Sequence, residues 1–203
     1  MIPEIVPPTT ASQDAISLLV DEHRLIVQML YALKDFTTGI RQSQPEEMTS
    51  EDLAAEKEKL AAFVEFFRTF ADAHHHAKEE DILFRIMVEN GFSTDMGPIA
   101  VMLHEHEVGR NWVGQLEQAS KEKNAWTGDE RKTIAAAAVS FVDLLEAHIQ
   151  KEDEILYPMA RSNLSQEAMK TVDEEVKVFQ KAAGTNGEQK RLLDLATSLL
   201  EGA

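Results

Sequence analysis

Two ten-residue segments, residues 75–84 and 148–157, are near copies of each other. Aligned without gaps, they share His, Lys, Glu, Ile and Leu, and Tyr157 takes the place of Phe84. Each begins with a histidine that a glutamate follows four residues later: Glu79 after His75, and Glu152 after His148. Four residues turn an α-helix through about 400°, so imidazole and carboxylate share one face, one turn apart. Two such helices facing each other would supply ligands for two metal ions.

The composition favours one helical domain. The chain has 203 residues, enough for a full core, with only nine Gly and six Pro. It has no cysteine, which excludes disulfides, thiolate zinc sites and iron–sulfur clusters. A formal charge of −16 argues against nucleic acid or an anionic membrane surface as a partner. The chain shows neither a run of about 18 apolar residues nor a signal peptide at its start, so a cytoplasmic location is expected.

Apolar residues recur at three- and four-residue steps through most of the chain, which predicts amphipathic helices. The expected helices cover residues 14–36, 53–90, 98–123, 130–157, 164–182 and 188–200. Loops are expected at residues 39–50 and 93–97, and Pro158 is expected near the end of the fourth helix. Four long helices with short connections predict an all-α, antiparallel up-down four-helix bundle with two additional C-terminal helical segments.

The expected domain plan has three parts. Residues 1–13 form a flexible N-terminal arm, residues 14–160 form the bundle with a dimetal site, and residues 161–203 form a helical extension. The extension is expected to pack on the bundle or on a partner, and a homodimer contact through it is one of the options.

Each of the four long helices places one histidine on its apolar face: His23, His75, His106 and His148. A single buried histidine is more often a hydrogen-bonded core residue than a ligand. However, Glu79 and Glu152 would be buried beside two of these histidines, and a buried carboxylate without a cation is costly. The combination predicts a metal site.

Several neighbouring residues compete for inward positions. Helical steps of about 100° put His75 at the centre of its apolar stripe, with His74 at the edge and His76 pointing to solvent. His104 falls on a polar face. A ligand role for His74, His104 or Asp153 stays open, with Asp153 able to replace or assist Glu152. The remaining charged residues of the two repeats are expected on solvated faces or in surface ion pairs, although Lys78 lies close to the inward face: Lys78, Glu80, Asp81, Lys151 and Glu154.

Four imidazoles and two carboxylates without sulfur suit iron or manganese, with zinc as a further option. The economical arrangement has two metals. His23 and His75 bind one, His106 and His148 bind the other, and the two glutamates bridge them. Water, hydroxide or oxide completes the bridge and leaves positions open for a small ligand.

This order of motifs resembles the hemerythrin-like, or HHE cation-binding, family: a histidine in the first helix, His-x-x-x-Glu, a third histidine, and a second His-x-x-x-Glu. The matching segments are residues 21–23, 75–84, 102–110 and 148–158, which together span about residues 14–160. The resemblance implies a non-haem centre of two iron ions, with manganese or zinc ranked below iron, in a four-helix bundle. It also implies that this centre meets dioxygen, nitric oxide or peroxide.

The chain departs from the oxygen carriers of this family at two positions. The carriers have His-x-x-x-His in the third helix, and the first of that pair corresponds to Met102 here. They also use an aspartate five residues after the last histidine, where this chain has Asp153 beside Glu152. A missing fifth histidine would leave the second iron more open, which favours redox or nitric oxide chemistry over simple oxygen carriage.

Four functions are therefore compared. The first is a diiron protein that binds or senses dioxygen or nitric oxide, and the second is an enzyme that turns over peroxide or nitric oxide. The third is an iron donor in stress repair, although comparable repair proteins often carry an N-terminal cysteine-containing region that this chain lacks. The fourth is a helical interaction domain with a structural metal. We rank them in this order.

Overall fold

The computed structural model describes residues 14–43, 46, 48–184 and 187–201; the N-terminal arm expected at residues 1–13 lies outside them. The described residues are helical throughout their long segments and contain no strand, so the prediction of an all-α chain is confirmed. The elements in order are α1 (Ala15–Gln42), α2 (Ser50–Phe66), η2 (Phe67–His76), η3 (Glu79–Phe84), α3 (Arg85–Glu89), α4 (Pro98–Ser120), α5 (Gly128–Lys151), η4 (Glu152–Leu156), α6 (Tyr157–Asn163), α7 (Gln166–Gly184) and α8 (Glu188–Glu201).

The helix starts follow standard capping chemistry. Asp14 caps α1 by accepting a hydrogen bond from the Ser17 backbone N–H. Thr127 opens α5 with a capping box that includes Glu130, and Thr49 does the same for α2. Two expected ends were wrong. Helix α1 continues through Gly39 to Gln42, and the fourth helical segment continues past Pro158 to Asn163. Pro158 lies in the first turn of α6, where its missing N–H costs least.

The segments η2, η3 and η4 are π-helical; η3 and η4 lie within the two sequence repeats, and η2 leads into the first repeat and ends at its second residue. A π-helix bonds each N–H to the carbonyl five residues back, and such turns are frequent at functional sites. Because it has more residues per turn than an α-helix, each residue rotates less about the axis. Side-chain directions in residues 67–84 therefore depart from the α-helical steps of about 100°.

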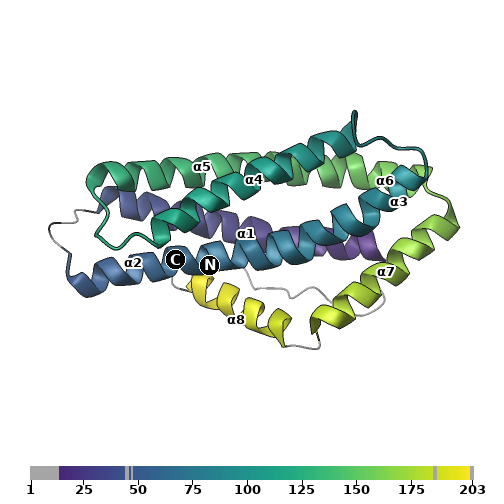
Figure 1. The fold of residues 1–203 in the computed structure, drawn as a ribbon. Helices are drawn as coiled ribbons and strands as arrows, with labels where there is room; N and C mark the ends of the chain where they lie inside the picture. The colour runs from purple at the N-terminus through teal and green to yellow at the C-terminus, as the bar shows by residue number, and fades with distance from the viewer. Residues whose placement is uncertain (1–13, 44–45, 47, 185–186, 202–203) are drawn as a thin grey trace.

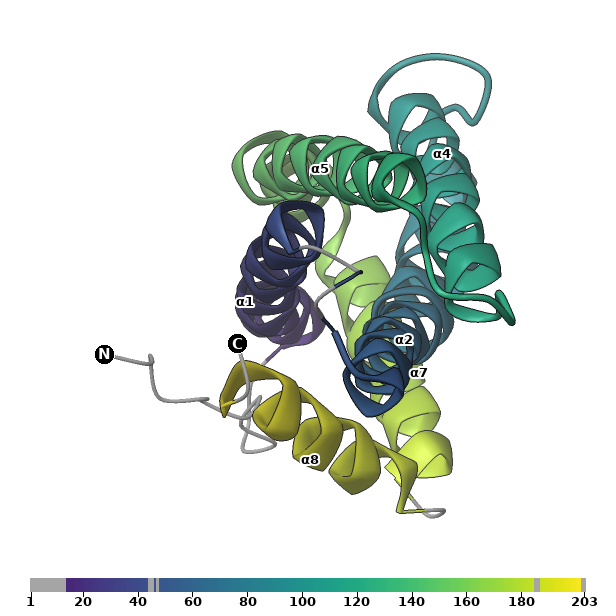
Figure 2. The same ribbon diagram turned by 90° about the vertical axis from the view of Figure 1, so that its left-hand side faces the viewer.

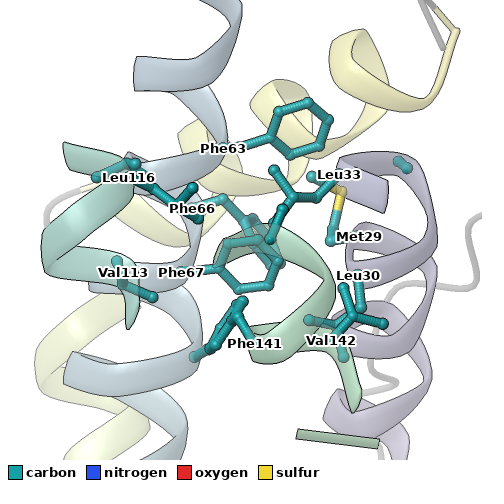
Figure 3. Packing of buried hydrophobic residues seen from close by; sticks show 14 of the residues in the cluster. Met29, Leu30, Leu33, Phe63, Phe66, Phe67, Val113, Leu116, Phe141 and Val142 are labelled. Atoms are coloured by element: carbon teal, nitrogen blue, oxygen red, sulfur yellow. The ribbon is translucent and has the colours of Figure 1, made fainter. Parts of the chain in front are cut away.

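The buried apolar residues form two separate clusters. The larger one is rich in phenylalanine, including Phe63, Phe66, Phe67 and Phe141 (Figure 3). The rings of Phe67 and Phe141 meet edge to face, with centroids 4.9 Å apart. The smaller cluster collects residues near the other ends of the helices, among them Leu19, Leu83, Met102 and Leu156.

A buried polar layer separates these two clusters. On α1 the chain passes from the smaller cluster through Glu22 and His23 to the larger one, and the next helical segment passes back through His75 and Glu79. Helix α4 and then α5–η4 repeat this reversal. Seen along their length, α1, α2, α4 and α5 surround a common core (Figure 2). The polar layer therefore receives side chains from all four segments.

The C-terminal helices pack on one side of this arrangement. Helix α8 contacts α1 and α2, while α7 contacts α1 and η3 (Figures 1 and 2). Val172 and Val176 of α7 are buried in the smaller cluster, and Leu192 of α8 is fully buried in the larger one. Both C-terminal helices therefore contact segments that bear the polar layer, and a partner contact of the extension stays a prediction.

One helical stretch, Gly128–Asn163, contains an 18-residue window of mean hydropathy 1.2, so by length and composition alone it could cross a membrane. Half of that window is buried inside the structure, and the core helix of a soluble protein has the same composition. The expectation that no segment spans a membrane therefore stays a prediction.

We expect the C-terminal helices to unfold together with the rest of the described fold. Leu192→Ala should lower the free energy of unfolding by about 2–4 kcal/mol, because it empties a fully buried position. The matched control is Val178→Ala in α7, where the side chain is 70% exposed and the change should be within about 0.5 kcal/mol. Urea unfolding followed by circular dichroism measures both; equal effects would show that α8 is not part of the cooperative unit.

Candidate metal centre

Two groups of buried side chains meet in the polar layer, and within each group the potential ligand atoms lie within 4.8 Å of one another. The first group contains His23, His75, Glu79 and Glu152, and the second contains His76, Glu79, His106 and His148. All six residues expected from the sequence are thus brought together. Glu79 belongs to both groups.

Glu152 also reaches both groups. Its carboxylate oxygens lie 3.2 Å from His23 Nε2 and 3.1 Å from His148 Nε2. In each half of the layer two imidazoles point Nε2 at each other. The Nε2 atoms of His23 and His75 are 2.9 Å apart, and those of His106 and His148 are 3.0 Å apart. These are the two histidine pairs for which a shared metal was predicted, and the presence of two metals stays a prediction.

The two glutamates test whether this set of side chains fits a cation. Both are completely buried, and among the described residues Glu79 Oε2 and both carboxylate oxygens of Glu152 lack a hydrogen-bond partner of acceptable geometry. Buried carboxylate oxygens without partners are strongly unfavourable. Cations held between these oxygens and the converging Nε2 atoms would satisfy them, so the residues fit a metal centre with nitrogen and oxygen ligands.

Each of the four paired imidazoles is held from behind by a carboxylate. The distances from Nδ1 are 2.8 Å for His23 to Asp153, 2.9 Å for His75 to Glu22, 2.6 Å for His106 to Glu80, and 2.9 Å for His148 to Glu105. An Nδ1–H that donates to a carboxylate leaves Nε2 free as a ligand atom and fixes the ring orientation. Four rings with this outer contact are thereby preorganised for metal binding.

Three of the four outer carboxylates, those of Glu22, Glu80 and Glu105, are in turn bound by lysine or arginine. Lys78 Nζ donates to Glu22, and Lys151 Nζ donates to Glu105. Arg110 donates to both Glu80 and Asp72. The expectation of surface ion pairs is wrong for Lys78, whose side chain is 2% exposed, whereas that of Lys151 is 35% exposed. Glu80 is also not simply solvated, because it is half-buried against His106.

His76 is the main correction to the expected site. Its side chain is buried, and its ring stacks on that of His106 with centroids 3.8 Å apart. The expectation that it points to solvent assumed α-helical steps, but residues 67–76 form a π-helix. The smaller rotation per residue lets His75 and His76 both face the polar layer. His76 therefore adds a fifth imidazole to the polar layer, whereas Met102 is buried in the smaller apolar cluster.

The other residues for which a ligand role was left undecided belong to neither group. His104 is exposed, as expected, and so are Asp81 and Glu154. His74 is half-buried at the C-terminal helices, with Nε2 3.7 Å from Glu188. Asp153 does not take the place of Glu152 but assists from outside by binding His23.

The pKa values describe the site without metal. Burial lowers the pKa of His75, and the charge of His23 lowers it further. For His23 burial also acts downward, but hydrogen bonds to Asp153 and Glu152 outweigh it and raise the pKa to about 9. Burial and the charge of Glu152 raise the pKa of Glu79 well above its usual range. Two carboxylates in one buried layer repel each other, and this repulsion is what a bridging cation removes.

Sequence reasoning missed three contributors. Glu22 and Glu105 each precede an inward histidine and hold the histidine of another helix, which no periodicity rule indicates. Tyr157 is buried, and its hydroxyl donates to Glu79 Oε1 at 2.6 Å. The available signal was the internal repeat, in which Tyr157 is the aromatic residue that carries a hydroxyl and Phe84 the one that does not.

Comparison with known proteins identifies the class to which this fold and site belong. The sequence model of the hemerythrin HHE cation binding domain matches residues 14–160, and the chain belongs to this family. It is thus a metal-binding, hemerythrin-like protein. Curated relatives include uncharacterized protein Rv1995 of Mycobacterium tuberculosis and uncharacterized protein Mb2018 of Mycobacterium bovis. Each is 24% identical over 163 residues, which cover 80% of this chain; the match spans 58% of the relatives' own length.

We expect His76→Ala to lower the metal content of the purified protein, because it removes one of three imidazoles from its group. His104→Ala is the matched control, since His104 is exposed on α4 and belongs to neither group. Metal per chain, measured by atomic emission after dialysis against a weak chelator, should fall for the first variant alone. Equal metal content in the two variants would show that His76 only packs in the layer and does not bind metal.

The two outer lysine–glutamate pairs should differ in their contribution to stability. In metal-free protein Glu22→Gln should cost about 3 kcal/mol, because it leaves the buried Lys78 without a counter-charge. Glu105→Gln removes the equivalent partner of Lys151, which reaches solvent, so the cost should be about 1 kcal/mol. Urea unfolding in the presence of chelator measures the difference; equal costs would contradict it.

Proposed function

We propose that the two groups hold a pair of iron ions that binds or senses dioxygen or nitric oxide. The observation that carries the proposal is the pair of buried glutamates, three of whose four carboxylate oxygens lack a hydrogen-bond partner among the described residues, beside five inward imidazoles. Iron pairs with nitrogen and oxygen ligands bind diatomic molecules and exchange electrons with them. The geometry supports two ions rather than one, because two separate groups share Glu79.

The chain's own residues prepare such a centre in three ways. Outer carboxylates orient the four paired imidazoles before any metal arrives. Apolar clusters on both sides of the layer limit water, since the six expected ligands are at most 2% exposed. The bridging glutamates carry negative charge that offsets part of the charge of two cations. For the segments that bear these residues we propose the expected antiparallel up-down bundle, which the alternating order of the two apolar clusters supports.

The fifth imidazole bears on the choice between functions. A site with four imidazoles would leave more open coordination positions on the second iron, which argues against simple oxygen binding. With His76 in the second group, three imidazoles would fill more of the coordination positions of the metal bound there. A small ligand would then bind reversibly at the metal of the first group, which has two imidazoles. Turnover of peroxide or nitric oxide is the second candidate, favoured by the buried phenol of Tyr157 beside Glu79, a proton donor within the layer.

The test is the metal content of natively purified protein, taken with its visible spectrum before and after adding azide. We expect about two irons per chain and charge-transfer bands that change with azide. Glu79→Gln should abolish both, because Glu79 is the residue common to the two groups. Asp81→Asn, an exposed carboxylate of the same segment, is the control and should change neither.

The outcomes separate the candidate functions. Azide-sensitive iron with no turnover of added peroxide or nitric oxide supports binding or sensing, and steady turnover supports the enzyme. Iron that leaves readily to a chelator supports the iron-donor role. One tightly held zinc, or folded protein without metal, would contradict the diiron proposal and leave a structural or interaction domain.

A further inference from the structure

Tyr157 occupies a distinctive position beside the first group. The residue is 1% exposed, its hydroxyl donates to Glu79 Oε1 at 2.6 Å, and it lies 3.4 Å from His23 Nε2. Its ring is nearly parallel to that of His23, with centroids 5.6 Å apart and an interplanar angle of 8°. The phenol therefore reaches the side of His23 that faces the centre, where the ligand atoms of the first group converge.

The pseudo-equivalent position in the other half has no hydroxyl. Phe84 corresponds to Tyr157 in the internal repeat and stacks near His106, with centroids 6.1 Å apart. A second difference accompanies the first, because His76 corresponds to Ile149 in the repeat. The second group thus has three imidazoles, while the first has two imidazoles and, beside them, a phenol. The half with fewer nitrogen ligands is the half with the hydroxyl.

The outer side of Tyr157 borders a cleft between α1 and α6. This α1–α6 cleft has a volume of about 360 Å³, and its lining includes Val20, Asp153, Tyr157 and Arg161. Two other cavities touch residues of the polar layer, one at Lys78 and one at His76, but each has a volume of about 20 Å³, room for one water-sized molecule. A small ligand that arrives through the α1–α6 cleft meets the phenol before it meets the imidazoles.

We propose that Tyr157 donates a hydrogen bond to a small anionic or diatomic ligand in the His23–His75 half of the centre. This inference rests on the proposed function and assigns the ligand to one half. Among the residues of the two groups and their hydrogen-bonded neighbours, Tyr157 has the one hydroxyl. The nearby ammonium groups of Lys78 and Lys151 bind carboxylates behind the imidazoles and face away from the ligand position.

The phenol, which donates to Glu79 here, would change its acceptor once a metal was bound. A carboxylate oxygen that coordinates a cation is a weaker hydrogen-bond acceptor than a free one, and Glu79 is shared by both groups. An anion beside Glu79 then becomes the stronger partner for the phenol proton. The ring itself need not move far, because His23 and Glu79 are both already within 3.4 Å of the hydroxyl oxygen.

The experiment is a titration of iron-loaded protein with azide, followed by the visible absorption bands. Tyr157→Phe should weaken azide binding by about 10- to 100-fold, the effect of one hydrogen bond to a charged group. Iron content should equal that of the wild type. Tyr31→Phe is the control, because Tyr31 is the other tyrosine of the chain and lies 48% exposed, bonded to Glu146. Azide affinity within twofold of the wild type in Tyr157→Phe, with iron retained, overturns the proposal and leaves the diiron function intact.

A second measurement covers the case in which Tyr157→Phe loses iron or folds poorly. The azide stretching band of the wild-type complex is recorded by infrared spectroscopy in H₂O and in D₂O. A donated phenol proton exchanges with solvent, so the band should shift between the two solvents. An identical band in both overturns the role of Tyr157, and iron-loaded wild-type protein that binds no azide overturns both this role and the proposed function.

Discussion

The burial of Glu79 and Glu152 is the constraint on which the rest of this structure depends. Both carboxylates are fully removed from water in a layer between two apolar clusters, where a lone negative charge is strongly disfavoured. No single helix can surround such a group with partners. The imidazoles must come from different helices, and the fold accordingly brings one or more histidines from each of its four site-bearing segments to the same level. The polar layer interrupts the hydrophobic core because the two carboxylates and the imidazoles around them have to lie at one level to serve as partners for each other.

The outer carboxylates extend this constraint to the way the helices are joined. Asp153 of η4 holds His23 of α1, and Glu80 of η3 holds His106 of α4. Each of these two contacts links the first half of the site, on α1 to η3, with the second half, on α4 to η4. The contacts of Glu22 with His75 and of Glu105 with His148 each lie within one half. A ring held at Nδ1 presents Nε2 in a fixed direction. The same hydrogen bonds therefore orient the ligands and fix the position of each helix along its neighbours.

Much of the fold and most of the site could be predicted from the sequence, and the failures have physical reasons. The stripe of apolar residues placed His23, His106 and His148 correctly because α1, α4 and α5 are regular α-helices. The same rule failed for His76 because residues 67–76 are π-helical, and a π-helix leaves no clear mark in the spacing of apolar residues. Helical spacing puts Lys78 close to the inward face, but its complete burial could not be foreseen. It depends on Glu22 from α1 and on the C-terminal helices, both distant in sequence.

The internal repeat implies two similar halves, but the structure makes them unequal at three places. His76 corresponds to Ile149 in the alignment of the repeats, and Tyr157 corresponds to Phe84. The C-terminal helices contact the half of the site on α1, α2 and η3. Phe179 and Leu192 from those helices line the small cavity that contains Lys78 and Glu22, while Lys151 in the other half reaches solvent. Charges interact more strongly where water is excluded, so the Lys78–Glu22–His75 chain acts on its metal position in a lower dielectric than its counterpart does. Two metal positions with the same bridging residues would thus differ in ligand number, in nearby proton donors and in the field of their surroundings. A symmetric pair would have no preferred side for an incoming molecule, and these differences provide one.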